Sequence, residues 1–561
     1  MKNGEKGSIS LYVLIACTFF ITILIAQYNS SLNKMKAIEE EVAQIQDNYE
    51  SAGKEIAYNK EKGVNTPKVT DGMIPVKYNQ DTGKWVICSS YDSEWYSYTQ
   101  TEKKWANVML SDGKYDTNAE IGTEVAENEL GSMFVWIPRF AYKITEGYHT
   151  STNGKISVVF LEGTSDNFYS NENNSSKMET ATRNIEDIID TNKKCYTQYI
   201  VHPCFTKGMT ESDSQIVENY DNGEWRTELT GIWVAKFQAG IYTTSNDSKT
   251  QKTLITSNTA NGLYYPVFKG RKFAYNYLSA SQCYDLSMAI DDNNNPYGLT
   301  EKANSHLMKN SEWGAVEYLS ISEYGYSNGV ASPDTQKSIN NLSLNGSTTN
   351  IRNQSVYAVT GYSGPKGITQ SNNNIKFNNV NLSLINEING SAGKSYAWNN
   401  VDVGRSKGRG TESSTTGNIY GIYDMGGCLA DYTASYVKSN PDYLQNGSSF
   451  ATNISTYLAT AYPVDNSSNN GIYDFNNNYN AYKNVYGDAI YETSYATSLT
   501  SNITAWFGHL FEGSDSVQEP FFPRGGAATF TSAVNGISAI GGDCGGADGI
   551  YYGFHTVLAV E

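Results

Sequence analysis

The sequence predicts an α+β protein in which an N-terminal transmembrane helix and a helical stalk carry a large domain of strands and loops. The first observation is an apolar, uncharged run near the N-terminus, and the second is a heptad pattern soon after it. The third is a series of short strand-like runs from residue 63 onward. Two amphipathic helices and several long segments rich in Asn and Ser interrupt these runs.

The transmembrane prediction rests on residues 8–26, which contain no charged side chain. At roughly 1.5 Å per residue this run spans a length close to the hydrocarbon core of a bilayer. Lys2 and Lys6 precede the run and residues 27–33 carry no charge, so the positive-inside rule places the N-terminus in the cytoplasm. We therefore expect the bulk of the chain to be extracytoplasmic at the cell membrane.

The segment before this run also resembles a prepilin leader. Lys6-Gly7-Ser8 is similar to a prepilin peptidase site, in which a short basic leader ending in Gly precedes an apolar helix. Type IV prepilins usually carry Glu at the fifth mature position, where this chain has Tyr12. A plain signal anchor, with a leader over 1–7 and a membrane helix over 8–27, is therefore preferred. A pilin-like filament subunit is the alternative.

A heptad pattern predicts a helical stalk over residues 28–62. Apolar side chains over 35–56 alternate spacings of three and four residues, while charged side chains such as Glu39 and Lys54 lie off this seam. A coiled coil between copies would bury the seam, and so would one helix lying against its own domain. The coiled coil would make residues 35–56 a self-association site, and the helix against its own domain is the alternative.

Two further segments follow the stalk. Residues 63–130 contain strand-like runs punctuated by Gly, Asp and Asn, which predicts a small β-rich module. Residues 131–561 are expected to form one larger domain. Its buried strands are predicted at 133–137, 156–161, 231–237 and 553–560, and its two helices are predicted to be capped by Ser279 and by Asn310 or Ser311.

Composition limits the class of partner. The formal net charge is −17, and an acidic chain repels phosphate backbones, so nucleic acid is not expected as a partner. The chain has 43 Tyr but only 18% charged residues, a balance that suits polar and aromatic contacts with a protein or glycan. A solvated exoprotein surface would have the same balance.

The sequence offers few groups for metal or nucleophilic chemistry. Seven cysteines and five histidines are scattered without zinc-ligand spacing, and no GxSxG, HExxH, P-loop or EF-hand pattern occurs. The run 291–295 and the loops near Asp543 and Asp548 supply oxygen atoms that suit Ca²⁺, although plain turns have the same composition. No cofactor is expected, and a structural Ca²⁺ ion is left open.

Four stretches, in order, resemble the motifs of one family. Residues 310–315 resemble its TEAEWEYAA helix, and residues 418–427 are similar to its N-x-x-G-L-Y-D-M-x-G-N motif. Residues 524–526 match the start of R-G-G-S-W, and residues 553–555 lie where the closing G-F-R strand is expected. On these motifs, residues 131–561 resemble the formylglycine-generating enzyme (sulfatase-modifying factor) superfamily. The resemblance implies a C-type-lectin-like fold.

The central motif also has an explanation from its residue types. Gly417 and Gly421 bracket a predicted short buried strand, and Gly426 and Gly427 allow a turn with positive φ. Asp424 can accept backbone amides in that turn. A structural carboxylate is therefore preferred to a catalytic one.

The enzymatic chemistry implied by the resemblance is not expected here. Catalytic members hold copper with paired cysteines between R-G-G and G-F-R, whereas this chain has only Cys544 in that interval. One thiolate cannot form such a bis-thiolate site. In addition, Ala528 replaces the Trp of R-G-G-S-W, and W-E-W becomes Ala430-Asp431-Tyr432. We expect a non-enzyme, with a formylglycine-generating-type oxidase as an alternative.

A second branch with this fold comprises the variable proteins of diversity-generating retroelements, in which the segment between R-G-G and G-F-R forms an exposed ligand face. Here residues 527–552 mix small, polar and aromatic side chains, which suits adaptable recognition. A Gly-rich structural loop is the alternative. The resemblance implies an adhesin- or receptor-like ligand-binding protein with a face formed by Thr529, Phe530, Thr531, Ser532, Asn535, Ser538, Asp543, Asp548, Tyr551 and Tyr552.

Overall fold

The computed structural model describes most of the chain beyond residue 57. Apart from single positions within them, the described ranges are 58–150, 153–172, 175–208, 225–241, 265–331, 360–361, 414–451, 458–464, 479–495, 504–509, 519–526, 537–541, 544–549 and 552–560. Leu14, Cys17, Thr18 and Thr411 are described as isolated positions.

The chain divides into two compact units, Met1–Ala57 and Tyr58–Glu561. The leader over 1–7, most of the expected membrane helix over 8–27 and the heptad seam over 35–56 lie outside the described residues. Within the described part of the chain, no helix has the length and apolar character needed to cross a membrane.

The predicted stalk over 28–62 is wrong at its end. Tyr58–Asn59 (β1) pairs with Val64–Asn65 (β2) in an antiparallel hairpin, so residues 58–62 belong to the second unit. Gly63 has φ of +64° in this hairpin, a conformation that glycine adopts without steric cost.

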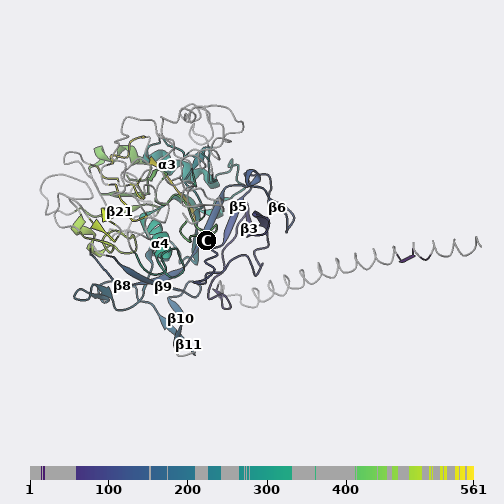
Figure 1. The fold of residues 1–561 in the computed structure, drawn as a ribbon. Coiled ribbons are helices and arrows are strands. Elements are labelled where there is room, and N and C mark those ends of the chain that lie inside the picture. Colours follow the sequence, from purple (N-terminus) through teal and green to yellow (C-terminus); the bar gives the residue numbers. More distant parts are fainter. Residues whose placement is uncertain are drawn as a thin grey trace, which may run out of the picture. The chain divides into compact units, whose positions relative to one another are not determined.

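The largest sheet in the described part of the second unit is antiparallel and has eight strands, and we call it the central sheet; Figure 1 labels its strands β3, β5 and β6. From edge to edge its order is β18 (Ser305–Leu307), β26 (Thr556–Leu558), β15 (Gly231–Ala235), β7 (Met133–Pro138), β5 (Asn107–Leu110), β3 (Met73–Asn79), β4 (Lys84–Ile87) and β6 (Glu124–Val125). The final strand therefore lies inside the sheet, as predicted.

The sheet does not respect the predicted boundary at residue 130. Strand β5 from the expected 63–130 module pairs directly with β7, with Asn107 opposite Val135. Residues 63–130 and 131–561 therefore share one sheet and one compact unit. Backbone hydrogen bonds join the two segments. Because every residue other than Pro has the same backbone donor and acceptor, residue composition could not predict this pairing.

Smaller sheets surround the central one. Two have three strands: β14 (Ile200–Val201), β8 (Phe140–Glu146) and β9 (Lys155–Phe160), and β22 (Ser494–Tyr495), β23 (Thr504–Ala505) and β24 (Gly508–His509). Antiparallel pairs are β10 (Asn167–Glu172) with β11 (Ser175–Thr180), β12 (Ile189–Asp190) with β13 (Cys195–Tyr196), and β16 (Gly240–Ile241) with β17 (Pro266–Val267). Parallel pairs are β19 (Ala430–Asp431) with β25 (Tyr552–Gly553), and β20 (Ser435–Val437) with β21 (Thr460–Tyr462).

Both predicted helices are present. Helix α3 (Ala280–Met288) begins after Ser279, whose Oγ accepts from Gln282 N at 3.3 Å, while Gln282 Oε1 accepts from Ser279 N at 2.9 Å. This reciprocal capping box satisfies two backbone donors at the helix start. A short helix, α7 (Ser448–Ala451), packs near α3.

Helix α4 (Asn310–Ile321) starts one residue before the predicted caps. Its N-cap is Lys309, whose backbone N–H donates to Glu312 Oε2 at 2.8 Å. All of its residues are buried, not only the predicted inner side of Trp313, Val316 and Leu319. The helix is therefore enclosed by both earlier and later segments of the chain, among them Tyr142 and Ile537.

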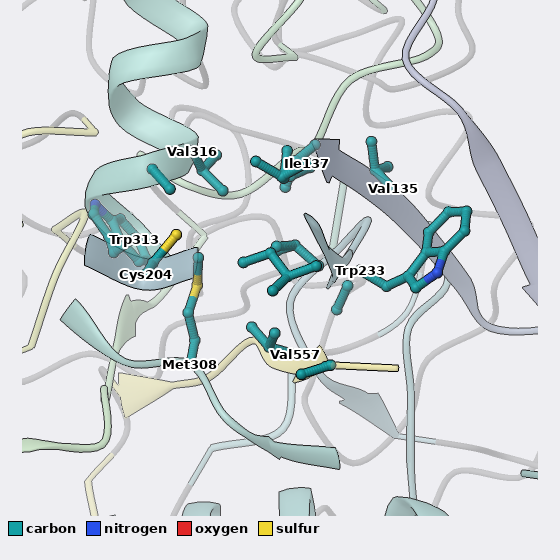
Figure 2. Close-up of a cluster of buried hydrophobic side chains, with 14 of the residues drawn as sticks. Val135, Ile137, Cys204, Trp233, Met308, Trp313, Val316 and Val557 are labelled. Atoms are coloured by element: carbon teal, nitrogen blue, oxygen red, sulfur yellow. The ribbon is translucent and has the colours of Figure 1, made fainter. Parts of the chain in front are cut away.

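The hydrophobic core lies on both faces of the central sheet. Val135 and Ile137 point to one face of β7, and Figure 2 shows Ile137 and Val316 of α4 pointing toward one another. Trp136 points to the other face, where its ring centroid lies 5.2 Å from that of Trp233. Burying an aliphatic or aromatic side chain of this size contributes about 1.5–3 kcal/mol.

Seven 3-10 turns complete the described secondary structure. They are η1 (Glu127–Glu129), η2 (Pro203–Phe205), η3 (Ala289–Asp291), η4 (Glu301–Ala303), η6 (Pro441–Tyr443), η7 (Gln445–Gly447) and η8 (Tyr479–Asn484). With more strand than helix, the second unit is a mixed, predominantly sheet structure.

The central motif folds differently from its prediction. Its apolar residues from Ile419 to Tyr423 are buried, but they form turns instead of a strand. Positive φ occurs at Asp424 (65°) and Cys428 (62°), not at Gly426, and Gly427 lies outside the described residues. Lys236 holds these turns, because its Nζ donates to the carbonyl oxygens of Ile419 at 2.6 Å and Gly421 at 2.9 Å. A tertiary contact therefore replaces the expected strand pairing.

Candidate functional site

The predicted ligand loop, residues 527–552, is anchored in the middle. Ile537, Ser538, Ala539 and Ile540 are all buried. The Trp313 indole donates to Ile537 O at 2.7 Å. The loop as a whole is therefore not the continuous exposed face that was predicted.

A buried charged network holds this anchor. The Ser538 hydroxyl donates to Glu317 Oε1, and Arg524 Nη2 lies 3.1 Å from Glu317 Oε2. Arg524 Nη1 also donates to Asp488 O at 2.9 Å. Burial raises the pKa of Glu317 to about 7, although Arg524 and Ser538 oppose that shift. Ser538, a predicted ligand contact, is therefore buried, and its hydroxyl is bonded to Glu317 of α4.

A second anchor follows at Cys544. Phe521 N donates to Cys544 O at 3.2 Å, and the Cys544 Sγ lies 3.0 Å from the Tyr432 hydroxyl. The Tyr432 hydroxyl also donates to Ala547 O at 2.7 Å. Burial raises the pKa of the Cys544 thiol to about 11, so the thiol is protonated at neutral pH. Each of the seven cysteines is a free thiol.

A partly exposed stretch, which we call the arc, follows the second anchor at residues 547–549 and ends at Tyr552. Ala547 and Asp548 are exposed, and Tyr552 is half-buried. The Tyr552 ring stacks on Tyr432 with centroids 4.7 Å apart, and β25 fixes its backbone by pairing with β19. The arc therefore presents side chains to solvent from a backbone held at both ends.

A neighbouring exposed segment, missed by the sequence analysis, adjoins this arc. Asn446 Nδ2 donates to Gly545 O at 2.7 Å, which places the turns η6 and η7 beside it. Tyr443 (37% exposed), Gln445 and Asn446 are exposed there. We define the C-terminal face as Tyr443, Gln445, Asn446, Ala547, Asp548 and Tyr552.

The structure describes three of the ten predicted ligand residues. It brings Asp548 and Tyr552 to the C-terminal face and buries Ser538. The other seven lie outside the described residues: Thr529, Phe530, Thr531, Ser532, Asn535, Asp543 and Tyr551. The exposed polar composition of 441–446 was the available signal for the missed residues, but its contact with Gly545 spans 99 residues of sequence.

The motif residues behind the face are mutually bonded. Asp424 accepts from Gly361 N at 2.8 and 2.9 Å and from Gln238 N at 3.3 Å, so its amide partners come from other segments than its own turn. His555 Nδ1 lies 2.8 Å from Asp431 Oδ2, and Gln238 Nε2 donates to Asp431 Oδ1 at 2.8 Å. Burial raises the pKa of Asp424 to about 7. These buried partners fit a structural role.

The predicted Ca²⁺ loop at 291–295 uses its oxygen atoms internally. Asp291 Oδ2 accepts from Ser305 N at 2.9 Å, and Asp292 Oδ1 accepts from the Tyr265 hydroxyl at 2.8 Å and from Asn294 N at 2.8 Å. Among the residues that the structure describes, no cluster of three or more His, Cys, Asp or Glu side chains could hold a metal ion.

No protein-family model matches the chain, and no curated protein matches it.

Proposed function

We propose that this chain is a membrane-anchored, extracytoplasmic ligand-binding protein, adhesin- or receptor-like, on a C-type-lectin-like scaffold. Its C-terminal face contacts a protein or glycan. One observation carries this proposal: the C-terminal segment is fixed at two buried anchors, residues 537–540 and Cys544, and then leaves Asp548 exposed and Tyr552 half-buried at the surface.

The convergence of the four motif stretches supports the scaffold assignment. The Trp313 ring centroid lies 6.4 Å from that of His555 and 5.5 Å from the Arg524 guanidinium carbon, and His555 Nε2 lies 3.1 Å from Tyr423 O. Tyr432 N donates to Gly553 O at 2.8 Å. Motif stretches more than 200 residues apart in the sequence therefore lie against one another.

The chemistry of the face supports recognition instead of reaction. It combines two tyrosine rings with amide and carboxylate side chains, which make adaptable polar and stacking contacts at low conformational cost. The thiol beneath it, Cys544, is protonated because burial raises its pKa to about 11. A rigid backbone below exposed side chains reduces the entropy lost on binding.

The test is binding of the purified full-length chain to a glycan array and to a peptide array. The triple substitution Tyr443→Ala, Asp548→Ala and Tyr552→Ala should weaken binding by at least about tenfold, because a few central residues dominate most interfaces. Tyr91→Ala is the matched control, since Tyr91 is 49% exposed and lies between β4 and β5. Thermal unfolding of both variants should stay near that of the wild type.

Two results would count against the proposal. One is a wild-type chain that binds nothing on either array, and the other is a triple variant that binds every wild-type ligand normally. A second variant, with Phe530, Asn535, Asp543, Tyr551 and Tyr552 all changed to Ala, tests the sequence-predicted positions in the same assay.

A further inference from the structure

Among the residues that the structure describes, no strand pairs with the outer edge of β11 in the hairpin of β10 and β11. Its two strands pair over six residues, from Asn167 opposite Thr180 to Glu172 opposite Ser175, and within the described chain they form a sheet of their own. The hairpin is attached by Phe168, which is buried and lies against Tyr199 with ring centroids 5.3 Å apart. Figure 1 shows β10 and β11 extending beyond β8 and β9.

The ladder fixes which backbone groups of β11 point outward. Ala181 N donates to Asp166 O at 2.8 Å in the same register as the hairpin, so Asp166 and Ala181 form a hydrogen-bonded pair. Such pairs alternate along an antiparallel ladder. The backbone groups of Lys177 and Glu179 therefore point to β10, while those of Met178 and Thr180 point to the outer edge.

Thr182, the next residue whose backbone groups point to the outer edge, already pairs with another strand. Thr182 N donates to Tyr199 O at 2.9 Å, and Val201 N donates to Thr182 O at 2.9 Å. The chain thus covers its own edge at Thr182 by strand-like pairing. That cover ends before Thr180, and an exposed strand edge of this kind is a template for another strand.

The side chains along the open edge are complementary to a second copy of themselves. Lys177 and Glu179 lie on one face of β11, two residues apart, with their charged groups 3.5 Å from each other. Met178 lies between them and is 51% exposed. If two β11 strands pair antiparallel about a two-fold axis at Met178, each Lys177 lies opposite the Glu179 of the other copy.

We propose that β11 is a self-association edge, through which two copies of this chain join their hairpins into one four-stranded antiparallel sheet. The occupant is a second copy because the sequence Lys-Met-Glu supplies both charges of each cross-strand pair in this register. The contact is short, so it is weak between free molecules and strong between chains concentrated on one surface. It is independent of the C-terminal face.

Cysteine cross-linking of the full-length chain tests the contact at its axis. Met178→Cys should form an intermolecular disulfide under mild oxidation, because paired residues in such ladders have Cα atoms about 5.5 Å apart, within disulfide reach. The control is Ile121→Cys, a 65% exposed position outside the hairpin, and the unsubstituted chain reports background from its own thiols. Cross-linking at residue 178 no greater than at residue 121 would overturn the proposal.

Charge reversal in the Met178→Cys background separates this register from any other contact. Lys177→Glu or Glu179→Lys alone places like charges opposite each other twice, which should lower cross-linking by about tenfold. The double reversal restores both pairs and should restore cross-linking. A mixture of the two single variants carrying different tags should cross-link to each other but not to themselves.

These outcomes also distinguish other partners of the edge. If the single reversals leave cross-linking unchanged, or if the mixture fails to cross-link, the two copies do not pair in this register and the proposal falls. A variant with Met178→Pro, which removes the outward N–H, should lower self-association measured by sedimentation at high protein concentration, while the thermal unfolding transition persists. If the Met178→Pro variant self-associates as strongly as the wild type, the association arises from another surface and the β11 edge is refuted.

Discussion

The buried carboxyl group of Glu492 allows the effect of burial on its pKa to be tested through the pH dependence of stability. Its Oε1 accepts from the Tyr142 hydroxyl at 2.6 Å and from the Tyr196 hydroxyl at 2.5 Å. Its Oε2 accepts from the Tyr318 hydroxyl at 2.7 Å and from Gly487 N at 2.6 Å. Burial nevertheless raises its pKa from 4.5 to about 7, because the loss of water outweighs the tyrosine hydrogen bonds.

The raised pKa gives a stability that depends on pH. Between pH 4.5 and 7 the folded chain keeps a proton on Glu492 that the unfolded chain releases. This group's contribution is therefore complete below pH 4.5 and is lost as the pH rises through 7. A pKa difference of this size corresponds to about 3 kcal/mol of unfolding free energy by pH 8.

Glu492→Gln removes the titration and keeps the side-chain size. At pH 5 the variant should be less stable than the wild type by about 1–2 kcal/mol, because an amide N–H replaces one acceptor among the tyrosines. By pH 8 it should have gained about 3 kcal/mol relative to the wild type. The difference between the two proteins thus changes sign across this range.

Urea unfolding followed by tryptophan fluorescence at pH 5, 6, 7 and 8 measures this difference. Glu120→Gln, at an exposed position, is the matched control and should track the wild type at every pH. A Glu492→Gln deficit that grows with pH would refute the reasoning, because it would mean that the folded state favours the carboxylate.

Three further perturbations test the anchors and α4. Arg524→Ala should cost about 3–5 kcal/mol in urea unfolding, because it leaves the buried Glu317 without its cation, and Glu317→Gln in the same chain should recover part of that loss. Gly314→Ala should destabilise despite the roughly 1 kcal/mol gain in helix propensity, because the new Cβ would lie 2.1 Å from Gly487 O; unchanged or raised stability would contradict that contact. Cys544 should resist iodoacetamide at pH 8 until urea unfolds the chain, as followed by peptide mass spectrometry, and rapid labelling of the folded protein would show that the thiol is not buried.

Local sequence patterns located the elements that local physics controls. The apolar run at 133–137 became β7, and Ser279 with Gln282 formed the capping box of α3 as its residue types require. Asp548 and Tyr552 were predicted at the surface from the family resemblance of the segment between R-G-G and G-F-R, and Asp548 is exposed while Tyr552 is half-buried. Each of these depends on residues within a few positions of one another.

Tertiary structure decided how distant segments share their polar groups. Ser538 belongs to the same polar loop as Asp548, yet it is buried because Glu317, 221 residues earlier, takes its hydroxyl. The pairing of β5 with β7 likewise merged two predicted modules into one sheet. The sequence by itself determined which segments are apolar enough to be buried, the start of α3 at Ser279 and how acidic the chain is. Only the folded chain decided which polar side chains are enclosed and which face solvent, because a hydrogen-bond partner hundreds of residues away has no signature in local periodicity.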